Sequence, residues 1–109
     1  MEIYQSSHKL LHELNENIKN LEKKHRYNIG EQIKEKSFEI LLLISKIKND
    51  NDKIRYINRA LDAANDIQLS IKLLKDLDVF NDEQSVHLNQ SIRDVTTLFE
   101  KLKNDEQKE

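Results

Sequence analysis

Apolar residues recur at spacings of three and four along most of the chain, which is the period of an amphipathic helix. The first stripe consists of Ile3, Ser7, Leu11, Leu14, Ile18 and Leu21. Four cationic or imidazole side chains follow at residues 23–26, where positive charge would face the negative end of the helix dipole. The pattern therefore predicts a first helix that ends with this run, just before a turn at Tyr27 and Asn28.

The second predicted helix is apolar over more than one side. It is expected to begin near Asn28 and to stop in the turn-forming run at residues 49–52. Its inward stripe is Ile29, Ile33, Ser37, Ile40, Ile44 and Ile47, and the surface is widened by Phe38, Leu41, Leu42 and Leu43. Such a helix must bury more than one side, either centrally in the bundle or against another subunit. We expect Phe38, Leu41 and Leu42 to form an oligomer interface.

Two further helices complete the pattern. The third spans about residues 53–77, and its inward stripe is Ile54, Ile57, Leu61, Ala64, Ile67, Ile71 and Leu74. The segment from Asn81 to Gln84 is typical of a capping box that starts the fourth helix, with Val79 or Phe80 as its hydrophobic staple. The fourth stripe, at strict four-three spacing, is Leu88, Ile92, Val95, Phe99 and Leu102.

Four helices of about 20 residues with short connections predict an all-α, antiparallel up-down-up-down four-helix bundle. We expect the bundle to occupy residues 1–103 and the polar residues 104–109 to form a frayed tail. The 109 residues suit one domain, and one glycine, no proline and 35% charged residues favour helices over strands. The longest apolar run, residues 40–44, is far shorter than a membrane span, and we expect residues 1–5 not to be part of a secretory signal. With no cysteine present, a cytoplasmic location is expected.

Little in the sequence is suited to catalysis. The single glycine, Gly30, rules out glycine-rich phosphate loops and nucleophile elbows. His8 and His12 lie four residues apart and could share a metal ion, but a zinc enzyme needs a third protein ligand, so solvated surface histidines are the simpler interpretation. We expect no enzyme activity, no cofactor, no metal site and no small-molecule substrate.

The charges are unevenly distributed although the formal net charge is only -2. Residues 1–59 contain 12 Lys and Arg against 9 Asp and Glu, whereas residues 60–109 contain 6 against 11. The basic residues Lys23, Lys24, Arg26, Arg55 and Arg59 allow two interpretations. They are either helix-end and ordinary surface charges or a patch that contacts phosphates.

The segment from Lys23 to Ile33, KKHRYNIGEQI, resembles the region before the long second helix of the accessory variability determinant (Avd) family of diversity-generating retroelements. An apolar second helix, a third helix that runs from Arg59 through the IKLLKDL segment, and a closing helix at residues 92–98 agree in order and spacing. The four-helix-bundle proteins encoded in 23S ribosomal RNA intervening sequences are similar. They usually carry an Ala-Glu-Gly-like motif on the second helix, and its absence here favours the Avd family.

The resemblance implies a non-enzymatic homopentamer that binds the retroelement reverse transcriptase and its template RNA and supports mutagenic complementary DNA synthesis. Carried over by position, the nucleic-acid contacts would be Lys23, Lys24, Arg26, Arg55 and Arg59. Contact with the reverse transcriptase and self-assembly are the main expectations, with RNA as a further ligand. The alternative is a generic bundle adaptor of the intervening-sequence type that acts through protein-protein contacts.

Overall fold

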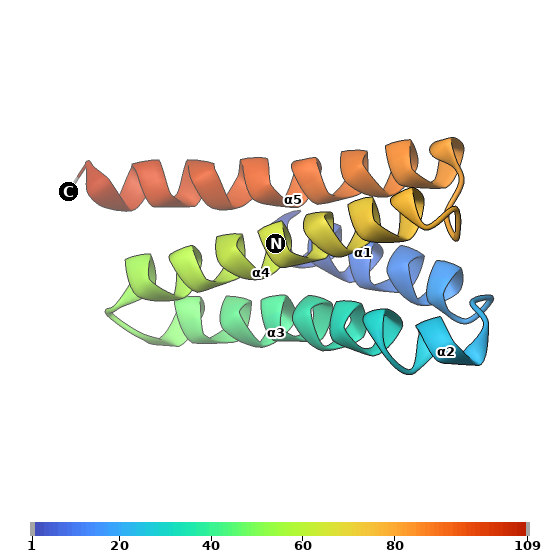
Figure 1. The fold of residues 1–109 in the computed structure, drawn as a ribbon. Coiled ribbons are helices and arrows are strands. Elements are labelled where there is room, and N and C mark those ends of the chain that lie inside the picture. Colours follow the sequence, from blue (N-terminus) through green and yellow to red (C-terminus); the bar gives the residue numbers. More distant parts are fainter. Residues whose placement is uncertain (1, 109) are drawn as a thin grey trace.

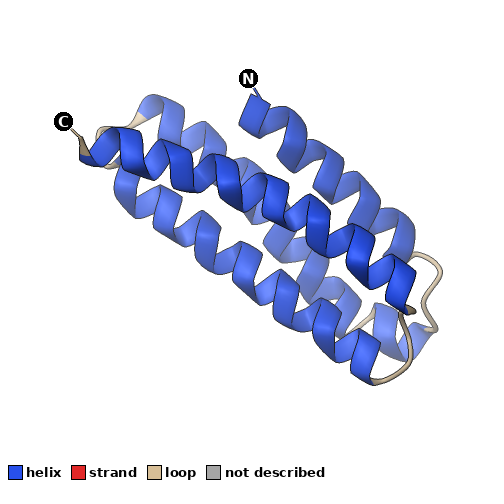
Figure 2. Cartoon of the chain, turned by 90° about the horizontal axis from the view of Figure 1, so that it is seen from above, coloured by secondary structure: helices blue, strands red, loops and turns tan. Residues whose placement is uncertain are grey.

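The computed structural model describes residues 2–108, which form four long helices and one short helical turn (Figure 1). The elements are α1 (Glu2–Ile18), α2 (Lys23–Arg26), α3 (Ile29–Asn49), α4 (Lys53–Asp76) and α5 (Asp82–Gln107). No strand occurs within residues 2–108, as the colouring of Figure 2 also shows. The all-α prediction is confirmed, with four long helices packed together. Met1 and Glu109, the ends of the expected domain and tail, lie outside the described residues.

Each long helix packs against the next one along the chain, and α5 packs against α1 to close the bundle. The result is an elongated body of 46 × 22 × 20 Å. In Figure 1 the α2 turn and the connection from α4 to α5 lie at one end, while the connection from α3 to α4 lies at the other. Groups on α2 and groups at the start of α4 are therefore separated by most of the length of the molecule.

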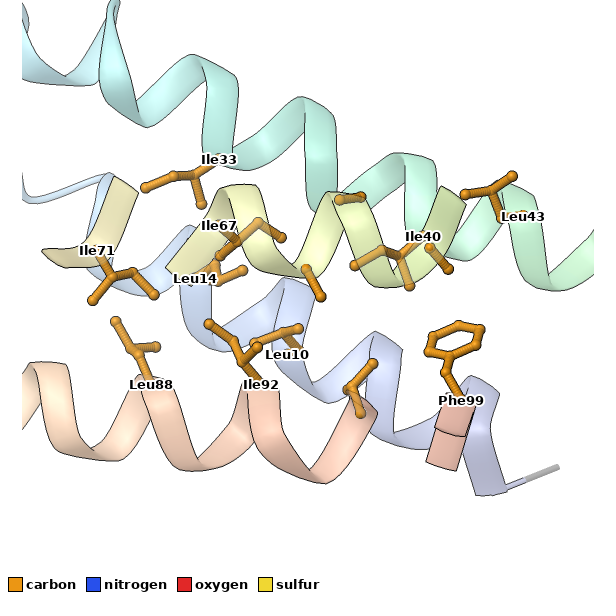
Figure 3. Packing of buried hydrophobic residues seen from close by; sticks show 14 of the residues in the cluster. Leu10, Leu14, Ile33, Ile40, Leu43, Ile67, Ile71, Leu88, Ile92 and Phe99 are labelled. Carbon is orange, nitrogen blue, oxygen red and sulfur yellow. The ribbon is translucent and has the colours of Figure 1, made fainter. Parts of the chain in front are cut away.

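Aliphatic side chains from all four long helices meet along the centre of the bundle (Figure 3). Fully buried examples are Leu14 of α1, Ile40 of α3, Ile67 of α4 and Ile92 of α5. Burying one such side chain stabilises the fold by roughly 1.5–3 kcal/mol, so the core supplies the main driving force for folding. On α4 the core positions include Ala60, Ala63 and Ala64, whose small side chains allow neighbouring helices to approach closely.

Most residues predicted to face inward are buried, but several of them are only half-buried. On α1 the buried residue is Leu10, at 1% exposure, and the prediction of Leu11 is wrong because Leu11 is only half-buried. Leu10 continues the stripe from Ser7 to Leu14 at spacings of three and four, so it lies closer to the centre of the buried face. On α4, Ile54 and Leu61 are only half-buried, and Leu61 packs against the edge of the core.

The expected end of the first helix is also wrong, since α1 ends at Ile18 and residues 23–26 form the separate turn α2. Leu21 folds back against the core, with 8% of its surface exposed, and its N–H donates to the Ile18 carbonyl. Glu22 then adopts extended backbone angles, φ -61° and ψ 151°, which a continuing helix cannot contain. Only Arg26 reaches back to the end of the first helix, where its Nη1 donates to the Lys19 carbonyl at 3.5 Å.

The start of α5 has the predicted capping box. The Asn81 Oδ1 atom accepts from the Gln84 N–H at 2.8 Å, and the Gln84 Oε1 atom accepts from the Asn81 N–H at 3.0 Å. At its other end α5 continues to Gln107, so residues 104–107 are helical where a frayed tail was expected. A carboxylate oxygen of Glu106 lies 3.8 Å from Lys53 Nζ on α4, which favours this extension. No helix within residues 2–108 has the length and apolar character needed to cross a membrane.

Candidate functional site

The basic turn, residues 23–27, brings three of the predicted contact residues together at one end of the bundle. Lys23 and Lys24 are exposed, and Arg26 is half-buried. The Arg26 guanidinium carbon lies 5.2 Å from the ring centroid of Tyr27, a cation–π contact. Tyr27 itself is 69% exposed. The turn therefore presents an aromatic ring and several positive charges to solvent within five consecutive residues.

Backbone hydrogen bonds and one close contact hold the basic turn in place. The N–H groups of Arg26 and Tyr27 donate to the carbonyls of Glu22 and Lys23 at 2.9 and 3.0 Å. Gly30, in the first turn of α3, lies so close to the end of α1 that a Cβ atom there would be 2.9 Å from Ile18 Cγ2. The same atom would lie 3.2 Å from the carbonyl oxygen of His25. The lone glycine of the chain thus allows α3 to start directly against α1 and α2.

Arg55 and Arg59, the other two predicted contact residues, lie in the first turns of α4, at the opposite end from the basic turn (Figure 1). Arg55 is 3.6 Å from an Asp52 carboxylate oxygen, and its guanidinium carbon is 5.0 Å from the Tyr56 ring centroid. Arg59 lies 3.7 Å from an oxygen of Glu39 on α3. The five predicted residues therefore form two separate groups, of which the second is engaged by carboxylates.

A polar cluster that the sequence analysis did not identify joins the end of α3 to α4. Tyr56 is only 8% exposed, and its hydroxyl donates to Asp50 Oδ2 at 3.2 Å. The Asp52 N–H donates to Asp50 Oδ1 at 2.9 Å. This backbone hydrogen bond is the main reason that the pKa of Asp50 is lowered, and the Tyr56 hydroxyl and the Arg55 charge act in the same direction. The sequence feature that could have revealed this cluster is the spacing of six residues between Asp50, in the turn, and Tyr56.

Replacing Asp50 by Asn is expected to destabilise the fold at neutral pH and to have less effect in strong acid. The folded chain holds the pKa of Asp50 below its ordinary value of 3.8, so the carboxylate stabilises the fold above that value. This contribution is lost as the pH falls through the lower folded-state pKa. Urea midpoints of both chains across this range measure it, with the exposed Asp62→Asn as control. A difference in urea midpoint between the wild type and Asp50→Asn that stays constant with pH would show that the Asp50 carboxylate does not stabilise the fold in this way.

The predicted oligomer interface is divided between solvent and core. We name Phe38, Leu41 and Leu42 the α3 apolar face. Phe38 and Leu42 are 56% and 51% exposed, whereas Leu41 is half-buried and packs against the core. In a single chain this face therefore remains largely in contact with water, where large apolar side chains are least favourable.

A second exposed apolar stripe lies on α4 and was missed by the sequence analysis. Leu69, Leu73 and Leu77 are 59%, 46% and 51% exposed, and their spacing of four places them on one side of α4, with Leu77 as its C-cap residue. We name them the α4 leucine stripe. The spacing of these leucines is visible in the sequence. The buried stripe of the same helix already explains its helical period, however, so the leucines were not considered as a second surface. The molecule thus presents groups of exposed apolar residues on two helices, α3 and α4.

A polar clasp joins α1 to α5 around Glu13, whose side chain is only 14% exposed. Both carboxylate oxygens accept from the Ser91 hydroxyl at 3.2 Å, and one also contacts His87 Nε2. The carboxylate lies between the hydroxyl and the imidazole. These contacts connect one residue of α1 to two residues of α5, so the clasp holds the two helices together.

No three His, Asp or Glu side chains within the described residues are grouped as a metal site would require. His8 and His12, the candidate metal pair, are both exposed on α1. At the end of the bundle where α1 begins, a hollow of about 170 Å³ is lined mainly by Ile3, Ile44, Ile47, Ile57 and Leu102. Its polar edge consists of Lys48 and the Lys53–Glu106 ion pair.

A scan against models of protein families and a search of curated proteins find no match to this chain. What the molecule binds is therefore inferred from its exposed surfaces. The surfaces available are the basic turn, the α3 apolar face and the α4 leucine stripe.

Proposed function

We propose that this protein is a non-enzymatic accessory protein of the Avd type that acts through binding. Its subunit would be an antiparallel up-down-up-down bundle that self-assembles, contacts a reverse transcriptase and template RNA, and supports mutagenic complementary DNA synthesis in the cytoplasm. The observation that supports this proposal most is the exposure of Phe38 and Leu42 on the α3 apolar face. A surface of this kind is suited to a protein partner, including another copy of the same chain.

Two separate apolar surfaces suit a ring better than a twofold dimer. In a cyclic assembly of more than two subunits, each subunit contributes two different patches that meet head to tail. The α3 apolar face and the α4 leucine stripe provide such a pair, and the pentameric number comes from the family resemblance. Burial of each large apolar side chain contributes roughly 1.5–3 kcal/mol. Association also costs free energy, because the subunits lose translational and rotational freedom. Several side chains must therefore be buried together.

The assembly is tested by sedimentation of the wild type and charge-insertion variants at tens of micromolar. We expect the wild type to sediment as an oligomer, and Phe38→Glu or Leu73→Glu to shift it to the monomer, since each places a charge in an apolar contact. Val86→Glu is the matched control, because Val86 is 66% exposed but lies on α5, outside both surfaces.

A strictly monomeric wild type at these concentrations would contradict the assembly. Circular dichroism and urea unfolding should show that all variants fold, since the substituted positions are exposed. If Phe38→Glu dissociates the oligomer and Leu73→Glu does not, the α3 apolar face belongs to the interface and the α4 leucine stripe does not.

The reverse-transcriptase part of the proposal has its own test. The neighbourhood of the gene should contain a reverse transcriptase and a pair of variable and template repeats, and that enzyme should copurify with this protein. Complementary DNA synthesis on the template RNA should fall when the protein is omitted. A gene position inside a ribosomal RNA gene, with no reverse transcriptase nearby, would favour the alternative.

The alternative is a bundle adaptor of the ribosomal RNA intervening-sequence type that binds protein and not RNA. It is favoured by the net charge of -2 and by the carboxylates that lie beside Arg55 and Arg59. Salt distinguishes the two functions, because binding through phosphates weakens steeply as salt is added. Partner binding that is insensitive to salt, with no RNA retained, would support the adaptor.

A further inference from the structure

We infer that the basic turn is a stacking platform for single-stranded nucleic acid, with Tyr27 receiving an unpaired base. This inference rests on the proposed RNA contact and assigns it a ligand class and a residue that the sequence analysis did not include. Tyr27 is 69% exposed, the highest fraction among the exposed aromatic residues of the described chain. An aromatic ring in water is unfavourable unless a partner covers it, and a nucleobase has a flat apolar face that fits such a ring.

One face of the ring already has a partner. The Arg26 guanidinium carbon lies 5.2 Å from the ring centroid, and Arg26 Nη1 also donates to the Lys19 carbonyl. These two contacts hold the guanidinium beside the ring. A base stacked on the other face of Tyr27 would form a layered arrangement of base, ring and cation, in which the guanidinium also approaches the phosphate backbone.

The charges around Tyr27 suit a phosphate chain. Lys23 and Lys24 are exposed on the preceding turn, and Lys23 has no carboxylate within ion-pair distance among residues 2–108. Within the same described range Lys24 pairs only with Glu22, at 3.9 Å, and the two side chains are 73% and 79% exposed. Pairs of this kind contribute little and can be replaced by a phosphate. Three cations are thus available within four residues.

The turn is also arranged before any ligand arrives. Its backbone is fixed by the hydrogen bonds of Arg26, Tyr27 and Asn28 to earlier carbonyls, and Gly30 lies close both to the His25 carbonyl of the turn and to Ile18. Binding would therefore order few additional groups in the protein, which reduces the entropic cost. The positive charges of the turn alone would attract any nucleic acid. An exposed aromatic ring favours unpaired bases, because the bases of a duplex are already stacked on one another.

Fluorescence anisotropy with labelled oligonucleotides of about a dozen nucleotides tests this inference, since single-strand sites span about 4–16 nucleotides. The probes are a single-stranded RNA, the DNA of the same sequence and a blunt duplex. Tyr27→Ala is expected to weaken binding of both single strands by about 5- to 150-fold, the range for loss of one stacked base. Tyr27→Phe should restore most of the affinity. Tyr4→Ala, which removes an exposed ring on α1, should have no effect.

Salt dependence separates stacking from charge. With three cations on phosphates, the logarithm of affinity should fall against the logarithm of salt with a slope of about -2 for single strands. Lys23→Glu should reduce that slope, whereas Tyr27→Ala should leave it nearly unchanged while lowering affinity. A stronger effect on RNA than on DNA would assign the ligand to RNA.

Two outcomes would overturn the platform, and they are distinguishable. If the oligonucleotides bind and Tyr27→Ala binds as tightly as the wild type, the stacking role is wrong and the proposed RNA contact survives through its charges. If no oligonucleotide binds at low salt, both the platform and the RNA contact are wrong. Assembly and reverse-transcriptase binding are measured separately and would not be affected by either result.

Discussion

Replacing Phe99 by Ala is expected to lower the free energy of unfolding by about 3–5 kcal/mol, because it removes the largest fully buried side chain of the core. Figure 3 shows its ring pointing from α5 into the centre of the bundle. Ion pairs near both ends of α4 and α5, Lys53–Glu106 and Lys75–Asp82, indicate that Phe99 lies near the level of Ala60. An alanine opposite the ring leaves little side-chain volume to fill the cavity that the substitution creates.

Urea unfolding of the two chains measures this effect. Phe99→Leu is the matched control, since it keeps an apolar side chain of similar size and should lose much less stability than the alanine. Glu100→Ala, at the exposed neighbouring position, should change stability by less than about 0.5 kcal/mol. A loss below about 1 kcal/mol for Phe99→Ala would mean that the bundle closes around the missing ring, and the close packing described here would be wrong.

The burial of Phe99 is a feature that the sequence alone could predict. Leu88, Ile92, Val95 and Phe99 recur at strict spacings on a helix whose other residues are mostly polar, and all four are fully buried. The period is less informative where apolar residues are adjacent. Leu10 and Leu11 differ by only 100° around the helix, so the choice between them depends on where α3 and α5 lie.

The basic turn was only partly predictable. The sequence identified Lys23, Lys24 and Arg26, but the extended backbone at Glu22 that detaches them from α1 follows from Leu21 turning into the core. Such a choice between continuing a helix and burying one side chain depends on neighbours that are distant in the sequence. The exposure of Tyr27 is a consequence of that break.

The predicted patch that included Arg55 and Arg59 illustrates a different limit. Charges that look alike in a sequence belong to one surface only if the fold brings them together, and the length of α3 separates these two from the basic turn. The α3 apolar face was easier to identify. Phe38 and Leu42 stand beside a complete buried stripe, so the excess of apolar residues predicts that some of them lie outside the core of a single chain.

Replacing Gly30 by Ala is expected to lower the free energy of unfolding by about 1–3 kcal/mol, the usual cost of an added methyl group in a packed site. In an open helix the same change would stabilise the fold by up to about 1 kcal/mol, so the sign depends on the space available. Here the new Cβ atom would lie 2.9 Å from Ile18 Cγ2 and 3.2 Å from the His25 carbonyl oxygen. Ile18 is fully buried and the carbonyl belongs to the backbone of α2, so neither can move away freely.

A double-mutant cycle with Ile18→Leu tests that cause. Leucine has no methyl branch at its β carbon, so it removes the atom nearest to the added methyl group while keeping nearly the same volume. We expect Gly30→Ala to be less destabilising in the Ile18→Leu background, with an interaction energy of about 0.5 kcal/mol or more, as for residues in direct contact. If Gly30→Ala stabilises the wild-type chain, or if the two changes are additive, then α3 does not press on the end of α1. The basic turn would then owe its position to its backbone hydrogen bonds alone.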